Sequence, residues 1–142
     1  MNQNFTDSVV QALETAFHRA ETNRQTEMTQ DHLLWAFLKE PQGYFSLILQ
    51  DLKADPKALL LKVEESLSKL ATYSTESSQP PTPSKGLQNC IAKAQSIAKE
   101  WKDTYTSSDH FLMAFWSDPS SVFKEWQDHL TISFDQLKQQ IK

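Results

Sequence analysis

The residues best able to do chemistry in this sequence are two aspartate–histidine pairs, Asp31-His32 and Asp109-His110. An imidazole beside a carboxylate can move a proton or help to hold a metal ion. Each histidine, however, stands at the start of an apolar run, and a metal site would need more ligands brought together. We therefore expect no metal site at either pair, and no catalytic residue is predicted.

The other reactive side chains also favour structural roles. Cys90, the single cysteine, lies on an apolar helical stripe, so we expect a small core residue rather than a nucleophile. A single cysteine cannot form an internal disulfide, which indicates a reducing compartment. The chain has two glycines, too few for a phosphate-binding loop, so no cofactor is expected in this domain.

The composition and net charge of the chain limit the kinds of partner that we expect it to bind. The net charge is -4 and the basic residues are scattered rather than gathered into a stripe, so we expect no nucleic-acid partner. The first residues are polar and no long apolar stretch follows, which predicts neither a signal peptide nor a membrane span. The sequence favours a cytoplasmic protein that does not bind membranes.

An internal repeat organises the elements that must position these residues. Asp31-His32 recurs as Asp109-His110, an offset of 78 residues, and the alignment continues at this offset without a gap. Most matched positions are apolar or suit the start of a helix, which duplicated units must retain because each copy buries the same face. Further identical pairs are Leu34/Leu112, Ala36/Ala114, Phe37/Phe115, Pro41/Pro119, Phe45/Phe123 and Leu52/Leu130.

The region between the copies is rich in serine and proline. Residues 72–83 contain almost no apolar side chain to bury, so we predict an exposed linker. The copies then span residues 5–71 and 84–142. Because 142 residues suffice for one domain with a core but not comfortably for two, residues 1–142 are interpreted as a single domain.

Apolar spacing predicts an all-α fold of eight helices, four in each copy, with the copies related by a pseudo-twofold axis and with no strand. Thr6 and Ser84 are predicted to cap the first helix of each copy, and Thr29 and Ser107 the second. The second helices are apolar all round, so we expect them at the centre of the domain.

Two shorter helices are predicted in the rest of each copy. The fourth helix of the first copy should begin at Asp55, with Pro56 in the first turn where proline fits. Its counterpart should begin at Ser133, with Gln136 placed for a capping box. The third helices are predicted to carry Phe45, Ile48 and Leu52 in one copy and Phe123, Trp126 and Leu130 in the other.

The duplicated helix starts resemble those of a known family. Phe5-Thr6 opens the first helix, and residues 29–38 read Thr-Gln-Asp-His-Leu-Leu-Trp-Ala-Phe-Leu. Residues 107–115 repeat this pattern as Ser-Ser-Asp-His-Phe-Leu-Met-Ala-Phe. Over nearly the whole chain the sequence resembles the Clp N-terminal repeat domain, and its serine- and proline-rich linker is closer to the ClpB type than to the ClpA or ClpC types.

The resemblance implies a function as the substrate-recognition domain of an ATP-dependent disaggregase chaperone. Such a domain binds unfolded or aggregated polypeptide and passes it to AAA+ rings, usually with a DnaK-type partner. The parent chain would be an ATPase that uses ATP and Mg, contains a coiled coil and forms a hexamer, whereas the isolated domain would be monomeric and not itself an enzyme. The alternative is an adaptor-docking domain of a ClpA- or ClpC-type unfoldase of a Clp protease.

The resemblance also implies site residues. In the ClpB family a threonine of the first helix and two acidic residues near the sixth helix are linked to substrate handling, and the matching positions are Thr6, Asp103 and Asp109. Helix capping and compensation of the helix dipole are the alternative explanation for Thr6 and Asp109. In ClpC-type domains, sites equivalent to Asp31 and Asp109, with Thr6 and Ser84, hold phosphoarginine.

Comparison of the two copies predicts an apolar binding surface. Ile97 aligns with Arg19, and Trp101 aligns with Asn23. If the copies pack alike, this edge of the helix faces water, and an exposed apolar patch usually binds something. Phe111 could extend the patch. The alternative is that Ile97 and Trp101 pack against the first copy.

The opposite asymmetry concerns four leucines of the first copy that align with polar residues of the second. The sequence indicates that they form the seam between the copies, and the alternative is a second adhesive face. They are Leu47, Leu49, Leu60 and Leu61.

Overall fold

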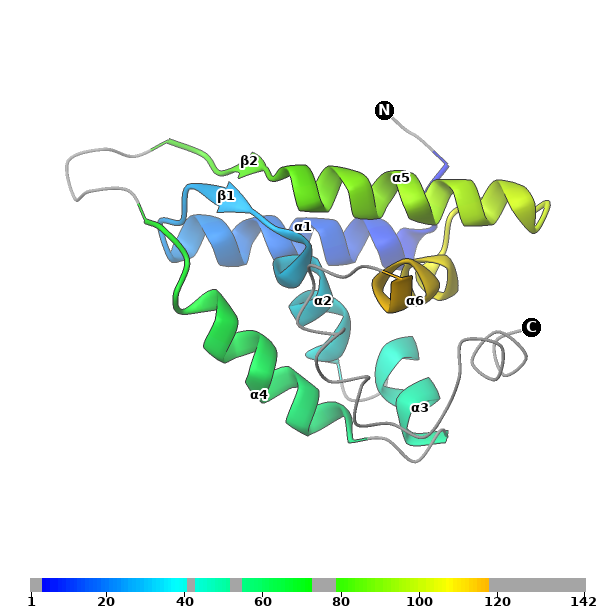
Figure 1. Ribbon diagram of the computed structural model, residues 1–142, viewed down its shortest axis with the longest axis horizontal. Coiled ribbons are helices and arrows are strands. Elements are labelled where there is room, and N and C mark those ends of the chain that lie inside the picture. The colour runs from blue at the N-terminus through cyan, green and yellow to red at the C-terminus, as the bar shows by residue number, and fades with distance from the viewer. Residues whose placement is uncertain (1–3, 41–42, 52–54, 73–78, 118–142) are drawn as a thin grey trace.

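The computed structural model describes residues 4–40, 43–51, 55–72 and 79–117. These ranges form six α-helices and two very short strands, and are mostly helical as predicted (Figure 1). The helices predicted around Phe123 and Ser133 lie outside the described residues. In chain order the elements are α1 (Asp7–Thr22), β1 (Glu27–Met28), α2 (Gln30–Leu38), α3 (Tyr44–Asp51), α4 (Pro56–Leu67), β2 (Thr82–Pro83), α5 (Lys85–Glu100) and α6 (Ser108–Ser117).

Helix bounds follow the repeat. α1 and α5 have 16 residues each, and both of their limits differ by the repeat offset. α2 and α6 also begin at matched residues, Gln30 and Ser108. α4 begins at Pro56, as predicted, behind Asp55, whose carboxylate accepts a 3.0 Å hydrogen bond from the Lys57 N–H. Equivalent apolar spacing therefore produces equivalent helices in the two copies.

The prediction that no strand forms is wrong. β1 and β2 pair in parallel, with Glu27 opposite Thr82 and Met28 opposite Pro83. The N–H of Ser84 donates to the carbonyl oxygen of Met28 at 2.9 Å. Backbone polar groups in a packed segment need such partners, and proline is acceptable at a sheet edge because it has no N–H to leave unpaired.

The end of the predicted linker is correspondingly more ordered than an exposed connection. Pro81 is buried, and the N–H of Thr82 donates to the carbonyl oxygen of Thr26 at 3.2 Å. The exposed-linker interpretation is therefore wrong for Pro81, whereas Gln79, Pro80, Thr82 and Pro83 are exposed as predicted, although Thr82 and Pro83 pair with β1. Residues 73–78 lie outside the described part of the chain.

The equivalent segments with the roles of the two copies exchanged pair in the same way. Phe5 forms a parallel bridge with Thr106, the positions that the repeat offset matches to Pro83 and Met28. The N–H of Thr6 donates to the Thr106 carbonyl at 3.1 Å, and the Thr106 N–H donates to the Asn4 carbonyl at 2.7 Å. Each copy therefore starts its first helix only after its backbone has paired with the other copy.

The second helices occupy the core, as predicted. In α2 both Leu33 and Leu34 are fully buried, and in α6 six consecutive residues from Phe111 to Trp116 are buried. The Phe37 ring stacks on Phe45 with centroids 4.5 Å apart and lies 5.8 Å from Phe111. Phe45 in turn meets Phe115 edge-on at 6.0 Å. Aromatic side chains thus join the copies, which adds directional contacts to apolar burial.

The predicted leucine seam is largely wrong. Leu49 is fully buried, but Leu47 is 45% exposed and Leu61 is 69% exposed. Leu60 is partly buried against the core. The aromatic cluster of α2, α3 and α6 fills the space between the copies, so most of these leucines are not needed there.

α1 and α5 end in the same way. Arg24 and Lys102, again matched by the repeat, have left-handed backbone angles, with φ of 56° and 63°. The N–H of the following residue, Gln25 or Asp103, returns to a helix carbonyl, that of Ala20 or Ala98, at 2.9 Å. This Schellman arrangement satisfies the last carbonyls of each helix and turns the chain toward the next one.

Replacing Lys102 by glycine should stabilise the protein by about 0.5–1 kcal/mol, because glycine adopts a positive φ without a Cβ clash. Lys102 is exposed, so little packing is lost. Lys99→Gly, within the last turn of α5, is the matched control and should destabilise by a similar amount. Urea unfolding followed by circular dichroism measures both, and a destabilising Lys102→Gly would contradict the role of this turn.

Candidate functional site

The start of α6 is organised by the side chain of His110, which is 1% exposed. Its Nδ1 accepts a 2.9 Å hydrogen bond from the backbone N–H of Ser107. Since that N–H can only donate, Nδ1 carries no proton, and the proton of the neutral ring sits on Nε2. Nε2–H then donates to the Oδ2 atom of Asp103 at 2.7 Å. The imidazole thus joins the end of α5 to the start of α6.

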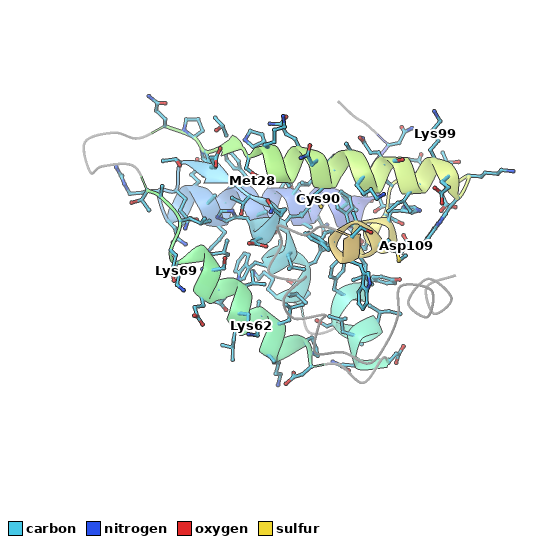
Figure 2. All side chains as sticks on the ribbon, viewed as in Figure 1. Met28, Lys62, Lys69, Cys90, Lys99 and Asp109 are labelled. Atoms are coloured by element: carbon cyan, nitrogen blue, oxygen red, sulfur yellow. The ribbon has the colours of Figure 1, made fainter. Side chains whose placement is uncertain are left out.

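A second carboxylate meets the same histidine. Asp109 accepts from the backbone N–H of His110 at 2.9 Å and from the hydroxyl of Ser107. Ser107 was predicted to cap α6, but the Asp109 carboxylate accepts the first-turn N–H instead. Figure 2 shows Asp109 on α6, below the end of α5 that carries Lys99. The helix-start interpretation of Asp109 is confirmed.

Both carboxylates remain accessible. The side chains of Asp103 and Asp109 are 48% and 28% exposed, although His110 between them is buried. Each keeps oxygen lone pairs for an outside donor, because a carboxylate accepts up to about four hydrogen bonds. The two acidic residues implied by the family resemblance are therefore brought together by one residue, because Asp103 accepts from the ring of His110 and Asp109 accepts from its backbone N–H.

In the first copy His32 forms the same pattern of hydrogen bonds as His110, with one difference. The Nδ1 atom of His32 accepts from the Thr29 N–H at 2.8 Å, and its Nε2–H donates to the amide oxygen of Gln25 at 2.6 Å. Thr29 caps α2 as predicted, and His32 completes a capping box. The repeat offset matches Gln25 to Asp103, so a neutral partner in one copy is a carboxylate in the other.

Neither partner of the histidines was identified from the sequence. The signal that could have found them is the equal spacing of seven residues from Gln25 to His32 and from Asp103 to His110. Burial, aided by the positive charge of Arg19, lowers the pKa of His32 to about 4. His32 is therefore a neutral structural residue at ordinary pH.

Thr6 does not make the predicted cap. No side-chain cap bond forms at the start of α1, and the buried Oγ1 of Thr6 has no hydrogen-bond partner among the described residues. The matched Ser84 does cap α5, since its hydroxyl oxygen accepts from the Leu87 N–H at 3.0 Å. The capping explanation is thus right for Ser84 and wrong for Thr6.

The predicted apolar patch is only partly present. Ile97 and Trp101 are partly buried and pack against the core. The Trp101 ring packs against the His110 ring at a tilt of 58°, with centroids 5.2 Å apart. Phe111 is fully buried and contacts Phe5 at 6.2 Å, so the prediction that it extends an exposed patch is wrong. Its position on the central helix explains this, because α6 is covered all round from Phe111 to Trp116.

A polar groove of about 440 Å³ borders this end of α5. Asn4, Lys99, Asp103 and Thr106 are among its lining residues. Ile97, Trp101 and Asp109 do not line this groove, but they lie at the same end of α5 and at the start of α6. We refer to this end of the molecule, with the groove included, as the α5–α6 face. It offers hydrogen-bond donors and acceptors beside apolar area, which can bind a peptide.

Other chemistries find little support in the described ranges. There, no three His, Cys, Asp or Glu side chains gather as a metal site would require. Cys90 is buried on α5 (Figure 2). No described helix combines the length and apolarity that crossing a bilayer requires.

Relatives of known sequence place the chain in a family. Residues 4–129 match the Clp repeat (R) N-terminal domain. The ClpB chaperone of Chlamydia pneumoniae is 38% identical over 136 residues, which are 96% of this chain and 16% of that protein. The ClpB chaperone of Chlamydia caviae is 38% identical over 135 residues, covering 95% of this chain and again 16% of the relative. The chain belongs to the Clp repeat N-terminal domain family.

Solved structures show the same fold. The Hsp104 N-terminal domain from Candida albicans has a TM-score of 0.81 at 23% identity, covering 97% of this chain and 89% of that one. A ClpV N-domain in complex with a VipB peptide has a TM-score of 0.75 at 19% identity, covering 97% and 84%. The chain thus shares its fold with the N-terminal domains of Hsp104 and ClpV, and it matches 16% of the length of the two ClpB chaperones.

The stability of the fold should decline as the pH falls from about 6.5 to about 4. His32 stays neutral when folded but takes up a proton on unfolding, so acid favours the unfolded chain, by on the order of 3 kcal/mol at the end of this range. His32→Asn, whose oxygen can still accept the Thr29 N–H bond, should flatten this decline. His18→Gln, at an exposed histidine, should not. Urea unfolding across the range tests this, and an unchanged slope in His32→Asn would refute it.

Asp103→Asn should cost less than about 1 kcal/mol, because an amide oxygen can accept from His110 as Gln25 accepts from His32. Asp103→Ala should cost about 1–3 kcal/mol, because it leaves the buried imidazole N–H unpaired. Thermal unfolding measures the difference between the variants. Equal losses for asparagine and alanine would mean that the bond to His110 contributes nothing.

Proposed function

We propose that this domain is the substrate-recognition module of a ClpB-type disaggregase and binds segments of unfolded or aggregated polypeptide. The observation that carries the proposal is the α5–α6 face, where Ile97 and Trp101 lie at the same end of α5 as the Asp103 carboxylate. Unfolded chains present apolar side chains and unpaired backbone N–H groups, and a face with apolar area and carboxylates complements both.

Family membership supports this proposal. The relatives that match the chain are named as ClpB chaperones, and a ClpV N-domain of the same fold holds a peptide. A domain that holds peptides in a related protein has a surface suited to extended chain. The same kind of ligand is proposed for this domain.

The proposed roles of the site residues follow from their positions. Asp103 and Asp109 would accept N–H groups or cationic side chains of the client, with His110 fixing both. Trp101 and Ile97 would supply apolar contact. The Thr6 hydroxyl, which lacks a partner among the described residues, would gain one when a client displaces the start of α1. Phe111 would support this face from below rather than touch the client.

The remaining steps are proposed for the longer chain. There, AAA+ rings would bind ATP and Mg, form a hexamer around a pore, and act with a DnaK-type partner in the cytoplasm. This domain would act before them, by holding a client long enough for the pore to engage it.

We further propose that the chain is a single domain whose second copy is completed by residues 118–142, giving eight helices around a pseudo-twofold axis. The equal bounds of α1 and α5 and the reciprocal backbone pairings support this arrangement.

The joint substitution of Ile97 and Trp101 by serine should weaken binding of casein, which lacks a stable fold, at least about tenfold, since apolar contacts at the centre of an interface dominate its affinity. Leu61→Ser removes an exposed leucine from α4 instead and should leave the affinity unchanged. Fluorescence anisotropy with labelled casein measures both.

Two other outcomes would count against the proposed client site or the proposed function. Unchanged casein affinity in the Ile97/Trp101 variant, with its fold intact by circular dichroism, would reject this face as the client site. Failure to bind casein, together with tight one-to-one binding of a folded protein, would indicate the adaptor-docking function instead.

A further inference from the structure

A second groove lies between α1, the end of α2, the beginning of α3 and the start of α6, and it shares no lining residue with the groove at the end of α5. Its volume is about 440 Å³. Ala12, Ala36 and Phe37 are its buried apolar residues, each less than 9% exposed. Its polar lining includes Ser8, Gln11, Thr15 and Ser108. We call it the α1–α3 groove. Its size is within the range of ligand-binding clefts.

The repeat provides an internal control for this groove. The offset matches Ser8 to Gly86 and Ser108 to Gln30. At Gly86 an added Cβ would lie 2.3 Å from the side-chain oxygen of Gln30, so the Gln30 side chain occupies the space beside the glycine. Gln30 is 8% exposed. In the second copy the matched position is therefore plugged, whereas the pair Ser8 and Ser108 leaves the α1–α3 groove open.

The open groove has an acidic and aromatic rim. Glu40 and Tyr44 line its edge, both exposed, and no lysine or arginine is among its described lining residues. The part of Tyr44 that is covered loses contact with water, which raises the pKa of its phenol, and the Asp109 carboxylate raises this pKa further. Tyr44 therefore stays an uncharged O–H donor with an aromatic face, and it lies within the field of a second carboxylate.

We propose that the α1–α3 groove binds a peptide segment in which an apolar side chain stands next to lysine or arginine. The apolar side chain would rest on Ala12, Ala36 and Phe37. The cation would lie at Glu40 and Tyr44, where a carboxylate and an aromatic face both attract positive charge. Charge complementarity selects this occupant, because the rim carries negative charge and the whole chain has a net charge of -4.

This proposal deepens the proposed function, on which it rests, by adding a second contact with its own preference for client sequence. The groove is lined by α1, α2, the beginning of α3 and Ser108 of α6, whereas the groove of the α5–α6 face lies at the end of α5. A client that engages both would be held more tightly than by either alone.

The test is to introduce the residues that close the matched position of the second copy into the α1–α3 groove. Ser8→Gly with Ser108→Gln places the residues of the closed copy into the open one. Its affinity for a short labelled leucine–lysine peptide should fall at least about tenfold. Glu40→Gln should weaken the same peptide and reduce the effect of salt on its binding. Glu65→Gln removes the same charge from an exposed site on α4 and should change neither.

A leucine–glutamate peptide of the same length should bind poorly to the unmodified protein. Equal binding of the two peptides would overturn the assigned ligand class. Unchanged affinity for the leucine–lysine peptide in both the plugged variant and Glu40→Gln would overturn the groove. The two variants are independent, so a folding defect in the plugged one leaves Glu40→Gln decisive.

Casein binding separates this inference from the proposed function. If the Ile97/Trp101 double serine variant loses casein while both groove variants bind the peptide normally, the groove proposal fails and the proposed function stands. If casein binds none of the proteins, including the unmodified one, the proposed function fails as well.

Discussion

The structure depends on a buried imidazole that accepts a backbone N–H through one nitrogen and donates through the other. In each copy this ring lies in the first turn of the central helix, accepts the backbone N–H of the residue before that helix, and donates to a residue in the turn that follows the preceding helix. A ring with one donor and one acceptor fits this position only in a single neutral tautomer. The angle between the first and second helices is thereby tied to a specific hydrogen-bond pattern as well as to packing.

Because the two copies share this geometry, side chains that differ between them can change the surface of the domain. Where one copy has Gln25, the other has Asp103, so the same structural bond leaves a carboxylate at the surface. Where one copy is filled by Gln30 over Gly86, the other has two serines and an open groove. Duplication allows one copy to keep the original side chains while its partner acquires a different surface, because each substitution alters a surface without altering the scaffold.

Apolar spacing and the repeat sufficed to predict the helices, the central position of the second helices and the proline at the start of α4. They could not predict which apolar residues would be covered. Phe111 is buried and Leu61 is exposed because coverage depends on how the two copies meet, which local periodicity does not encode. The histidine partners were missed for a related reason. Gln25 and Asp103 lie in turns, where side-chain hydrogen bonds follow backbone geometry rather than a repeating pattern.

The reciprocal pairing of Phe5 with Thr106 and of Pro83 with Met28 has an implication for how such a domain arises. A contact in which segment A of one unit meets segment B of the other, and the reverse, is the geometry of an isologous homodimer. A single unit would expose both an unpaired backbone edge and one side of the phenylalanine cluster. A single unit would therefore associate with a second copy rather than stay monomeric. Joining two units in one gene keeps that dimer at every concentration and lets its two surfaces evolve separately.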